Sequence, residues 1–567
     1  MERLGAWREV TAATAGIAAK VVVAVAAAVL LAVGPAAAGR SPSVDIGPRP
    51  HTVLLPYAAR RAGLTPPRRL VWGTQFMLEA YPEWHDLDVE LELPRVREVG
   101  MTSIRTNLRW DDVEPENTTP EDFDWSVPDR QLGQFAEQGF DVLVTVVAYP
   151  RWATVYQCGY DLRMGAEPEW REFIREAALR YKDHVSGWEI GNEPDGRTEV
   201  LPHDWQRPVG WGRGEPTVPL GGCWGDRPEP YRRFVAAAYE EIKAVDPTVP
   251  VSFGSLGHAP GFRLDMLDRY LEVGGGEVMD YLGLHWFPDA KYDPPDGLQR
   301  YRMLVATMRS HGYDKPVWLT ETYRLTHPEI PETEARQIDF VTKDLVEMVA
   351  QPEMERVYWY GWIDLPEELF DGVDDYERGL VRSDRTPKPA LRILPDTMAA
   401  TAGQTRNIST MEVIAFRFTR PRSGTDYVIA WGRDGRGAEL VLPVAPGTTV
   451  TAVSYPPEML MDGRCCDVAE LREEGGVVTV AVDEDARFVR VPASPVSGSS
   501  PDPGPWLPIT STPTPSPPVP ATWSPSPPPS ATPSPSPTAS PTATPSPLPG
   551  ATASPPPDAS AAPPAAP

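Results

Sequence analysis

The chain has few cysteines, few histidines and no excess of positive charge. Its 567 residues include 4 cysteines and 8 histidines, and 53 basic side chains are set against 79 acidic ones, a formal net charge of −26. So few cysteines exclude a small disulfide-framework protein. The acidic balance argues against a nucleic-acid partner, because phosphate backbones bind clustered Lys and Arg. No glycine-rich phosphate loop follows any predicted strand, which argues against a nucleotide-dependent enzyme.

The N-terminal segment is the one part of the chain with a sustained apolar run. Basic residues precede the run Val21–Val33, which is followed by Pro35 and by three alanines ending at Ala38. This order predicts a secretory signal over residues 1–38. The run is shorter than the roughly 18–20 residues that span a bilayer, so an uncleaved anchor is the alternative. We expect a secreted protein, extracellular or at the cell surface, with no membrane span after cleavage.

Proline gathers at the other end of the chain. Residues 501–567 hold 26 of the 68 prolines, and their only charged residues are two aspartates. Such a segment buries too little apolar surface to offset the entropy of ordering, so we predict a disordered Pro/Ser/Thr-rich tail over 499–567. The composition is typical of an extended stalk or linker with Ser and Thr for O-glycosylation, through which the protein would associate with a cell wall.

Between residues 70 and 400, short β-branched runs alternate with amphipathic stretches such as 168–184, 230–246 and 332–349, the pattern of a parallel sheet with crossover helices. Eight such runs occur, the number that a closed (β/α)8 TIM barrel needs. We therefore predict a barrel over 70–400, after a lead-in at 39–69. The predicted strands are Leu70–Phe76, Ser103–Leu108, Asp141–Val147, Ser186–Gly191, Pro250–Gly254, Tyr281–Trp286, Pro316–Thr320 and Arg356–Gly361.

The sequence changes texture after the barrel. Over residues 408–492, six alternating apolar runs are separated by Gly and Pro turns, which predicts a small antiparallel β-sandwich. No catalytic cluster of side chains is evident in it. Packing against the barrel is the role that we expect for this domain, and carbohydrate binding is the alternative.

The ends of two predicted barrel strands carry acidic side chains. The fourth strand runs into Asn192 and Glu193, and the seventh runs into Glu321. Catalytic side chains of such barrels lie at the C-terminal ends of the strands, and strands four and seven stand on opposite sides of the opening. Paired carboxylates in this position can split a glycosidic bond, one by protonating the leaving oxygen and the other by attacking the anomeric carbon.

These motifs resemble those of the retaining (β/α)8 glycoside hydrolases of clan A, above all families 39 and 5. WEIGNEPD at 188–195 and VWLTETY at 317–323 are the most specific, and three others support them: SIRTNLRWDDVEPE at 103–116, LGLHWFPD at 282–289 and GLVRSDRTPKPAL at 379–391. The resemblance implies that Glu193 is the general acid/base and Glu321 the nucleophile. It also implies that Asn192 hydrogen-bonds the sugar 2-hydroxyl, an interaction that strengthens in the transition state.

Further polar residues at the strand ends would support this pair. The matching arginine of these families keeps the nucleophile ionised, so Arg105 would do so here, or else form a structural ion pair. His285 would hydrogen-bond a sugar hydroxyl or the nucleophile, or serve as a structural histidine. Relatives carry a tyrosine where this chain has Phe287, which cannot hydrogen-bond, and Tyr323 or His285 would substitute for it. We interpret Glu189 as a structural carboxylate.

Tryptophans near the strand ends are candidates for stacking on a sugar face, because pyranose faces pack well on aromatic rings. Trp359 and Trp362 lie at the end of strand eight, and Trp152 lies on the loop after strand three. Membership of the core is the alternative for each of them.

The cysteines and histidines show no metal-ligand spacing, so we expect no metal and no cofactor. Cys158 and Cys223 fall on loops after neighbouring strands, where a disulfide is plausible in a secreted protein. Cys465 and Cys466 are adjacent, and the sequence leaves open whether they form a bridge or stay reduced.

Taken as a whole, the sequence predicts a secreted, monomeric, retaining O-glycosidase that acts on a β-linked polysaccharide or oligosaccharide. The alternative is a catalytically weak or inactive glycosidase-like barrel that acts as a surface carbohydrate-binding protein.

Overall fold

The computed structural model describes eleven parts of the chain. The predicted signal and lead-in, the whole of the predicted tail, Cys158 and Cys223 lie outside them. The described residues are 70–76, 85–119, 122–154, 166–196, 224, 227–257, 263–288, 297–327, 332–364, 377–420 and 424–492.

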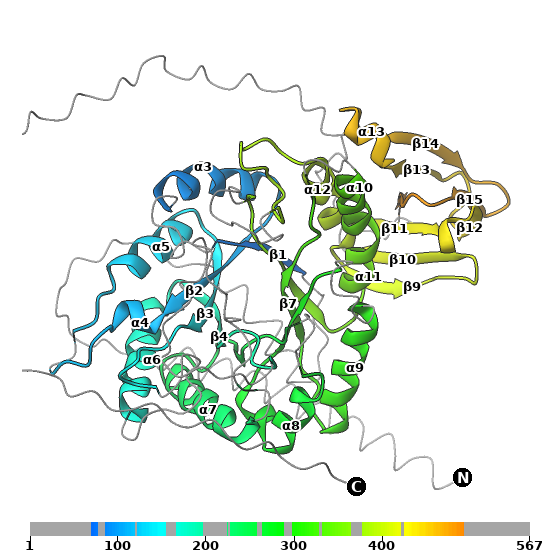
Figure 1. The fold of residues 1–567 in the computed structure, drawn as a ribbon. Helices are drawn as coiled ribbons and strands as arrows, with labels where there is room; N and C mark the ends of the chain where they lie inside the picture. Colours follow the sequence, from blue (N-terminus) through cyan, green and yellow to red (C-terminus); the bar gives the residue numbers. More distant parts are fainter. Residues whose placement is uncertain are drawn as a thin grey trace, which may run out of the picture. The chain divides into compact units, whose positions relative to one another are not determined.

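Eight parallel strands form the first domain, as the sequence predicts (Figure 1). They are hydrogen-bonded in the order β5-β4-β3-β2-β1-β8-β7-β6. The two outer strands of this order, β5 and β6, are joined by a bridge between Leu256 and Leu284, which brings the barrel close to closure. The strands are β1 (Val71–Gln75), β2 (Ser103–Arg109), β3 (Asp141–Val147), β4 (Val185–Ile190), β5 (Val251–Phe253), β6 (Leu282–Trp286), β7 (Val317–Thr322) and β8 (Met354–Trp359).

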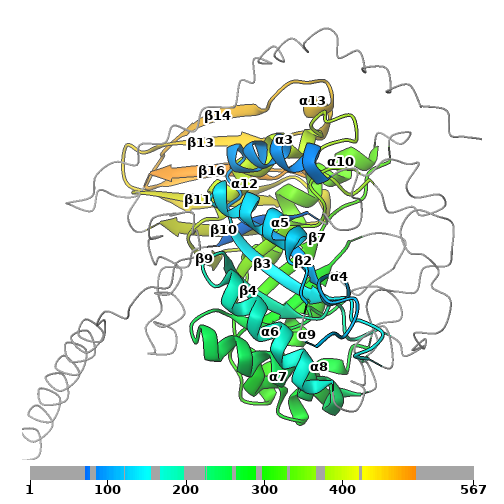
Figure 2. The same ribbon diagram turned by 90° about the vertical axis from the view of Figure 1, so that its left-hand side faces the viewer.

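Helices cover the outside of these strands, and Figure 2 shows α5, α6 and α7 alongside β2, β3 and β4. The segment predicted as one helix over 332–349 is α10, a π-helical turn η3 and α11 in succession. The helices are α3 (His85–Glu98), α4 (Trp110–Val113), α5 (Ser126–Glu137), α6 (Glu167–Tyr181), α7 (Pro228–Val245), α8 (Met266–Glu272), α9 (Gly297–Ser310), α10 (Glu332–Asp339), η3 (Phe340–Asp344), α11 (Leu345–Val349) and α12 (Pro389–Thr401). No helix among the described residues is long and apolar enough to cross a bilayer.

Aromatic side chains fix the helices to one another and to the strands. Trp170 on α6 is fully buried and stacks on Phe234 of α7, with ring centroids 4.3 Å apart. Both helices begin with a proline in the first turn, where the missing N–H is not needed. The apolar spacing in the sequence thus becomes a layer of packed rings around the barrel.

The second domain consists of antiparallel sheets. The larger sheet has the order β14-β13-β16-β11-β10-β9, and β12 pairs with β15 in a separate ribbon. An aliphatic core that includes Val428, Leu440 and Val480 fills the space between the sheets. The strands are β9 (Gln404–Asn407), β10 (Val413–Arg420), β11 (Thr425–Gly432), β12 (Ala438–Pro443), β13 (Thr449–Ser454), β14 (Asp467–Arg472), β15 (Val477–Val482) and β16 (Arg487–Pro492).

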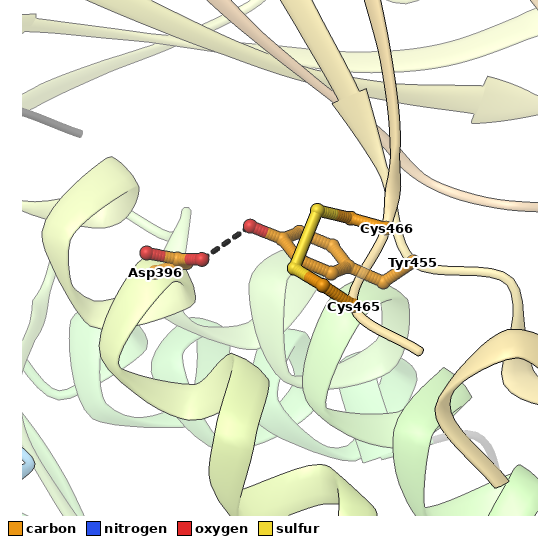
Figure 3. The surroundings of a disulfide bond; sticks show 4 residues. All are labelled: Asp396, Tyr455, Cys465 and Cys466. Atoms are coloured by element: carbon orange, nitrogen blue, oxygen red, sulfur yellow. Dashed lines mark hydrogen bonds between the residues drawn. A yellow bond between two sulfur atoms is a disulfide. The ribbon is translucent and has the colours of Figure 1, made fainter. Parts of the chain in front are cut away.

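The β domain packs against the barrel through an aromatic layer. Phe416, Trp431 and Phe488 belong to the same hydrophobic cluster as the barrel core. Tyr455 donates a hydrogen bond to Asp396 of α12, and Figure 3 shows this contact beside a disulfide. The disulfide joins the adjacent cysteines 465 and 466, just before β14, which decides the question that the sequence left open.

Candidate active site

The loop after β4 holds Glu193 in a strained backbone conformation. Gly191 has a φ of +91° and Glu193 a φ of +43°, in the left-handed region that residues other than glycine rarely adopt. A Cβ at Gly254, after β5, would lie 2.5 Å from the Gly191 carbonyl, so only glycine fits there. The Glu193 amide donates to the Ser255 carbonyl at 2.9 Å. These contacts between two strand ends hold Glu193 in its conformation.

Glu193, Glu321 and His285 come together at the C-terminal ends of the strands. His285 Nδ1 lies 2.8 Å from Glu193 Oε1 and 3.4 Å from Glu321 Oε2. The pairing of β6 with β7 shifts register after Leu284, and this irregularity sets His285 opposite Glu321. One oxygen of each carboxylate and one ring nitrogen lie within 4.8 Å of one another. The two glutamates of the sequence motifs therefore share one site.

Arg105 of β2 links both sides of this site. It is fully buried and donates from Nε to Glu189 Oε2 at 2.7 Å, from Nη2 to Asn192 Oδ1 at 2.9 Å, and from Nη1 to Gln75 Oε1 at 2.7 Å. Nη1 also donates to Glu321 Oε1. The structure thus places Arg105 against the predicted nucleophile. Gln75, at the end of β1, lies in none of the sequence motifs, so nothing in the sequence signals that it belongs to the site.

Glu189 lies beneath the site and is closed to solvent. Thr145 donates to its Oε2 at 2.8 Å, and Ser255 donates to its Oε1. Ser255 in turn accepts a hydrogen bond from Thr320 at 2.6 Å. Burial alone would raise the pKa of Glu189, but Arg105 and the Ser255 hydroxyl lower it below its usual value. Glu189 is therefore an ionised carboxylate whose oxygens are both bound by protein groups.

The other titratable groups of the site have shifted pKa values as well. Burial raises the pKa of Glu321, and neither His285 nor Arg105, which act in the opposite direction, cancels that effect. Burial lowers the pKa of His285 to about 4, although Glu321 acts to raise it. His285 is therefore neutral near pH 7 and can donate from one ring nitrogen only.

A second buried ion pair lies directly behind Glu193. Asp195 is fully buried, accepts the Gly257 amide at 2.8 Å, and lies 3.4 Å from an Arg300 nitrogen of α9. Burial raises the pKa of Asp195 to about 7, and the charge of Glu193 adds to the effect that Arg300 opposes. Asp195 is the last residue of the WEIGNEPD motif, and its position in that motif was the signal available in the sequence.

The aromatic residues after β6 and β7 pack on each other. Tyr323 stacks on Phe287 with ring centroids 4.5 Å apart, and both side chains are buried. The Phe287 ring is also 5.9 Å from the His285 ring. His285, one of the two residues expected to replace the tyrosine of relatives, lies 3.4 Å from a Glu321 oxygen.

For two of the three tryptophans, the structure favours the alternative that the sequence left open, membership of the core. Trp359 and Trp362 are only 2% and 1% exposed, so neither presents an open ring face to a sugar. Their indole N–H groups donate to the Arg378 carbonyl at 2.9 Å and to Glu92 Oε2 at 2.7 Å. Trp152 is partly exposed and remains a candidate for stacking.

The cluster of Glu193, His285 and Glu321 offers three ligand atoms at a spacing that can hold a metal ion. Arg105, however, already donates to Glu321. Its positive charge would compete with a cation at that carboxylate, so we assign no metal here.

No protein-family model matches the chain, and no curated protein matches its sequence. Solved structures do match its fold. A family 39 glycoside hydrolase from the gut symbiont Bacteroides cellulosilyticus WH2 is 16% identical, with a TM-score of 0.54 over 75% of this chain and 81% of the other. A glucosidase from Croceicoccus marinus is 15% identical, with a TM-score of 0.51 over 76% and 97%. The catalytic domain of GH30 xylanase C from Talaromyces cellulolyticus is 12% identical, with a TM-score of 0.51 over 76% and 98%.

These likenesses confirm, at the level of fold, the resemblance to the (β/α)8 glycoside hydrolases of clan A. The matches extend over three quarters of this chain.

Proposed function

We propose that the protein is an O-glycoside hydrolase that cleaves β-linked polysaccharides or oligosaccharides with retention of configuration. The observation that carries this proposal is the position of Glu193 and Glu321 at the ends of β4 and β7, with an oxygen of each within 4.8 Å. Retaining enzymes hold their two carboxyl groups about 5–5.5 Å apart, whereas inverting enzymes leave roughly 6.5–9.5 Å for a water molecule. A closest approach of the two carboxylates within 4.8 Å is compatible with the shorter separation of retaining enzymes.

In the first step, a Glu321 oxygen attacks the anomeric carbon and forms an ester bond to the sugar. The bond to the leaving oxygen breaks as Glu193 transfers its proton to that oxygen. In the second step, the Glu193 carboxylate takes a proton from water, whose oxygen attacks the anomeric carbon and releases Glu321. The side chain of Glu193 is 18% exposed and that of Glu321 is 8% exposed. The greater exposure of Glu193 suits its role as the acid/base, because that residue exchanges protons with water.

Neighbouring groups fit these roles. Asn192 uses Oδ1 to accept from Arg105, so its amide N–H groups remain the donors for a sugar 2-hydroxyl. A neutral His285 can donate from Nδ1 to Glu193 without adding a charge to the site. Arg105 keeps Asn192 and Glu321 in a fixed relation. Each of these residues is thus held in place before a sugar binds.

One observation favours a second candidate function. Phe287 stands where relatives carry a tyrosine, and it stacks on Tyr323 instead of hydrogen-bonding to Glu321. A barrel that binds carbohydrate at the cell surface with little or no hydrolysis would be compatible with that change.

A panel of β-linked polysaccharides and oligosaccharides tests the proposal. The wild type is expected to hydrolyse one of them. Proton NMR should show that the product initially has the same anomeric configuration as the substrate. The variants E193Q and E321Q are expected to lose activity by roughly 10²–10⁴-fold or more. E240Q is the matched control, because Glu240 lies on α7 with a side chain 61% exposed.

A 2-deoxy-2-fluoro glycoside of the sugar identified in the panel then separates the candidates. Covalent labelling of Glu321, located by peptide mass spectrometry, is expected of a retaining enzyme. An inverted product would refute the retaining mechanism. Carbohydrate binding by the wild type without hydrolysis or labelling would establish the second candidate in its place.

We also propose that the protein is secreted, on the strength of its N-terminal segment alone. N-terminal sequencing of the protein recovered from the culture medium is expected to begin at Gly39. Retention of the full segment in the membrane fraction would refute cleavage.

A further inference from the structure

One guanidinium lies between two buried carboxylates at the base of the proposed active site. Arg105 and Glu189 are 0% exposed and Glu321 is 6% exposed. The Arg105 Nε donates to Glu189 at 2.7 Å, and its Nη1 donates to Glu321. A single positive charge is therefore shared by two negative charges, only one of which the proposed reaction uses.

Glu189 cannot itself act on a substrate. Its Oε2 accepts from Arg105 and Thr145, and its Oε1 accepts from Ser255. These contacts come from three other strands or strand ends around the barrel and leave the carboxylate fully enclosed. Replacing it with a neutral group would be compatible with the local shape, so the charge of Glu189 needs an explanation of its own.

We propose that Glu189 is a positioning residue that fixes the Arg105 fork and takes up much of its positive charge, so that Glu321 keeps the electron density it needs to attack. This inference rests on the proposed function of Glu321 as nucleophile. A carboxylate that received the whole charge of a buried arginine would be a weaker base and a weaker nucleophile.

Arg105 acts to lower the pKa of both carboxylates, but their net pKa shifts have opposite signs. Burial is the largest influence on both, yet the pKa of Glu189 is lowered and the pKa of Glu321 is raised. His285 acts to lower both, and Glu193 raises that of Glu321. Ser255 stabilises only the charge of Glu189. Of the two carboxylates, Glu189 contributes more than Glu321 to raising the pKa of Arg105.

The test is the ionisation of Glu321 in the variants E189Q and E189D. Carbon NMR of protein labelled at the glutamate side-chain carboxyl gives this pKa directly, and the missing signal in E321Q identifies the resonance. E189Q keeps the shape of the side chain and removes its charge, so the pKa of Glu321 is expected to fall by roughly one unit. E189D keeps the charge and shortens the side chain, so the pKa of Glu321 is expected to stay closer to that of the wild type.

Kinetics provide the second readout. The acidic limb of the kcat/KM profile is expected to move to lower pH in E189Q, with a loss of roughly tenfold at the optimum, and to stay in place in E189D. If E189Q does not fold, the double variant T145V/S255A removes two hydrogen bonds from Glu189 without changing its charge. Because that variant keeps the charge of Glu189, the pKa of Glu321 is expected to change by less than about one unit from the wild type, and a larger fall would overturn the role of that charge.

The outcomes separate this inference from the proposed function. An unchanged pKa of Glu321 in folded E189Q, or equal shifts in E189Q and E189D, would overturn the role of Glu189 even in an active glycosidase. A shift in E189Q alone would support it even if the panel of sugars showed no hydrolysis, in which case the proposed function would be the part that fails.

Discussion

Replacing Arg105 with lysine keeps the positive charge but removes the planar fork that reaches four side chains. Three nitrogens of Arg105 bond to Glu189, Gln75, Glu321 and Asn192. A lysine ammonium presents its donors from a single point, and we expect it to reach one carboxylate at most. The R105K variant should therefore lose stability as well as activity.

The size of the effect follows from the bonds that are lost. One charge-assisted hydrogen bond contributes about 1.5–3 kcal/mol, and each bond to the neutral Gln75 and Asn192 contributes about 0.5–1.5 kcal/mol. The free energy of unfolding of R105K should therefore fall by about 2.5–6 kcal/mol. That is a large share of the roughly 5–15 kcal/mol by which a typical domain is stable.

Urea denaturation followed by tryptophan fluorescence measures this difference. Arg171 is the matched control, because it too bonds to several side chains, Glu167, Glu240 and Glu241, but its own side chain is 29% exposed. R171K should change the free energy of unfolding by no more than about 0.5–1 kcal/mol. If R105K costs no more than R171K, the four buried bonds do not stabilise the fold as we infer.

Two further predictions concern stability. Because burial raises the pKa of Glu321, the ionised carboxylate disfavours the folded state, and the stability associated with this group is lost as pH rises through its folded pKa. E321Q should therefore be more stable than the wild type near pH 7. This advantage should vanish below the usual glutamate pKa of about 4.3. If E321Q and the wild type had the same thermal transition near pH 7 as well as at the lower pH, the prediction would be contradicted. Y455F should lower the free energy of unfolding by about 1–3 kcal/mol, because it leaves the Asp396 carboxyl without the Tyr455 hydroxyl. Calorimetry checks it, and an unchanged transition would show that this contact between the domains is not stabilising.

The barrel could be predicted from sequence because its strands are continuous apolar runs. The missed strands are β9 and β14 of the second domain, which are polar edge strands that the rules of alternating hydrophobicity do not detect. The interruption of 332–349 by a π-helical turn leaves the apolar spacing nearly unchanged, so the sequence indicates a single helix.

The candidate site was predictable only in part. Glu193 and Glu321 stand in motifs at strand ends, so their meeting follows from the barrel topology. Gln75, Thr145 and Ser255 are ordinary polar residues on three different strands or loops, and only the closed barrel brings them around Arg105 and Glu189. Trp359 and Trp362 lie near a strand end, but that position alone does not show whether a side chain faces the barrel opening or packs in the core, and both are buried.

The aromatic layer between the two domains bears on how the protein can be produced and engineered. Five aromatic side chains that follow α12 in the sequence pack in the same hydrophobic cluster as the barrel core: Phe416, Phe418, Tyr427, Trp431 and Phe488. A chain cut after Thr401 would leave the barrel side of this layer open to water and prone to aggregation. Recombinant versions are best ended after Pro492, with the β domain kept as a permanent cover for the barrel.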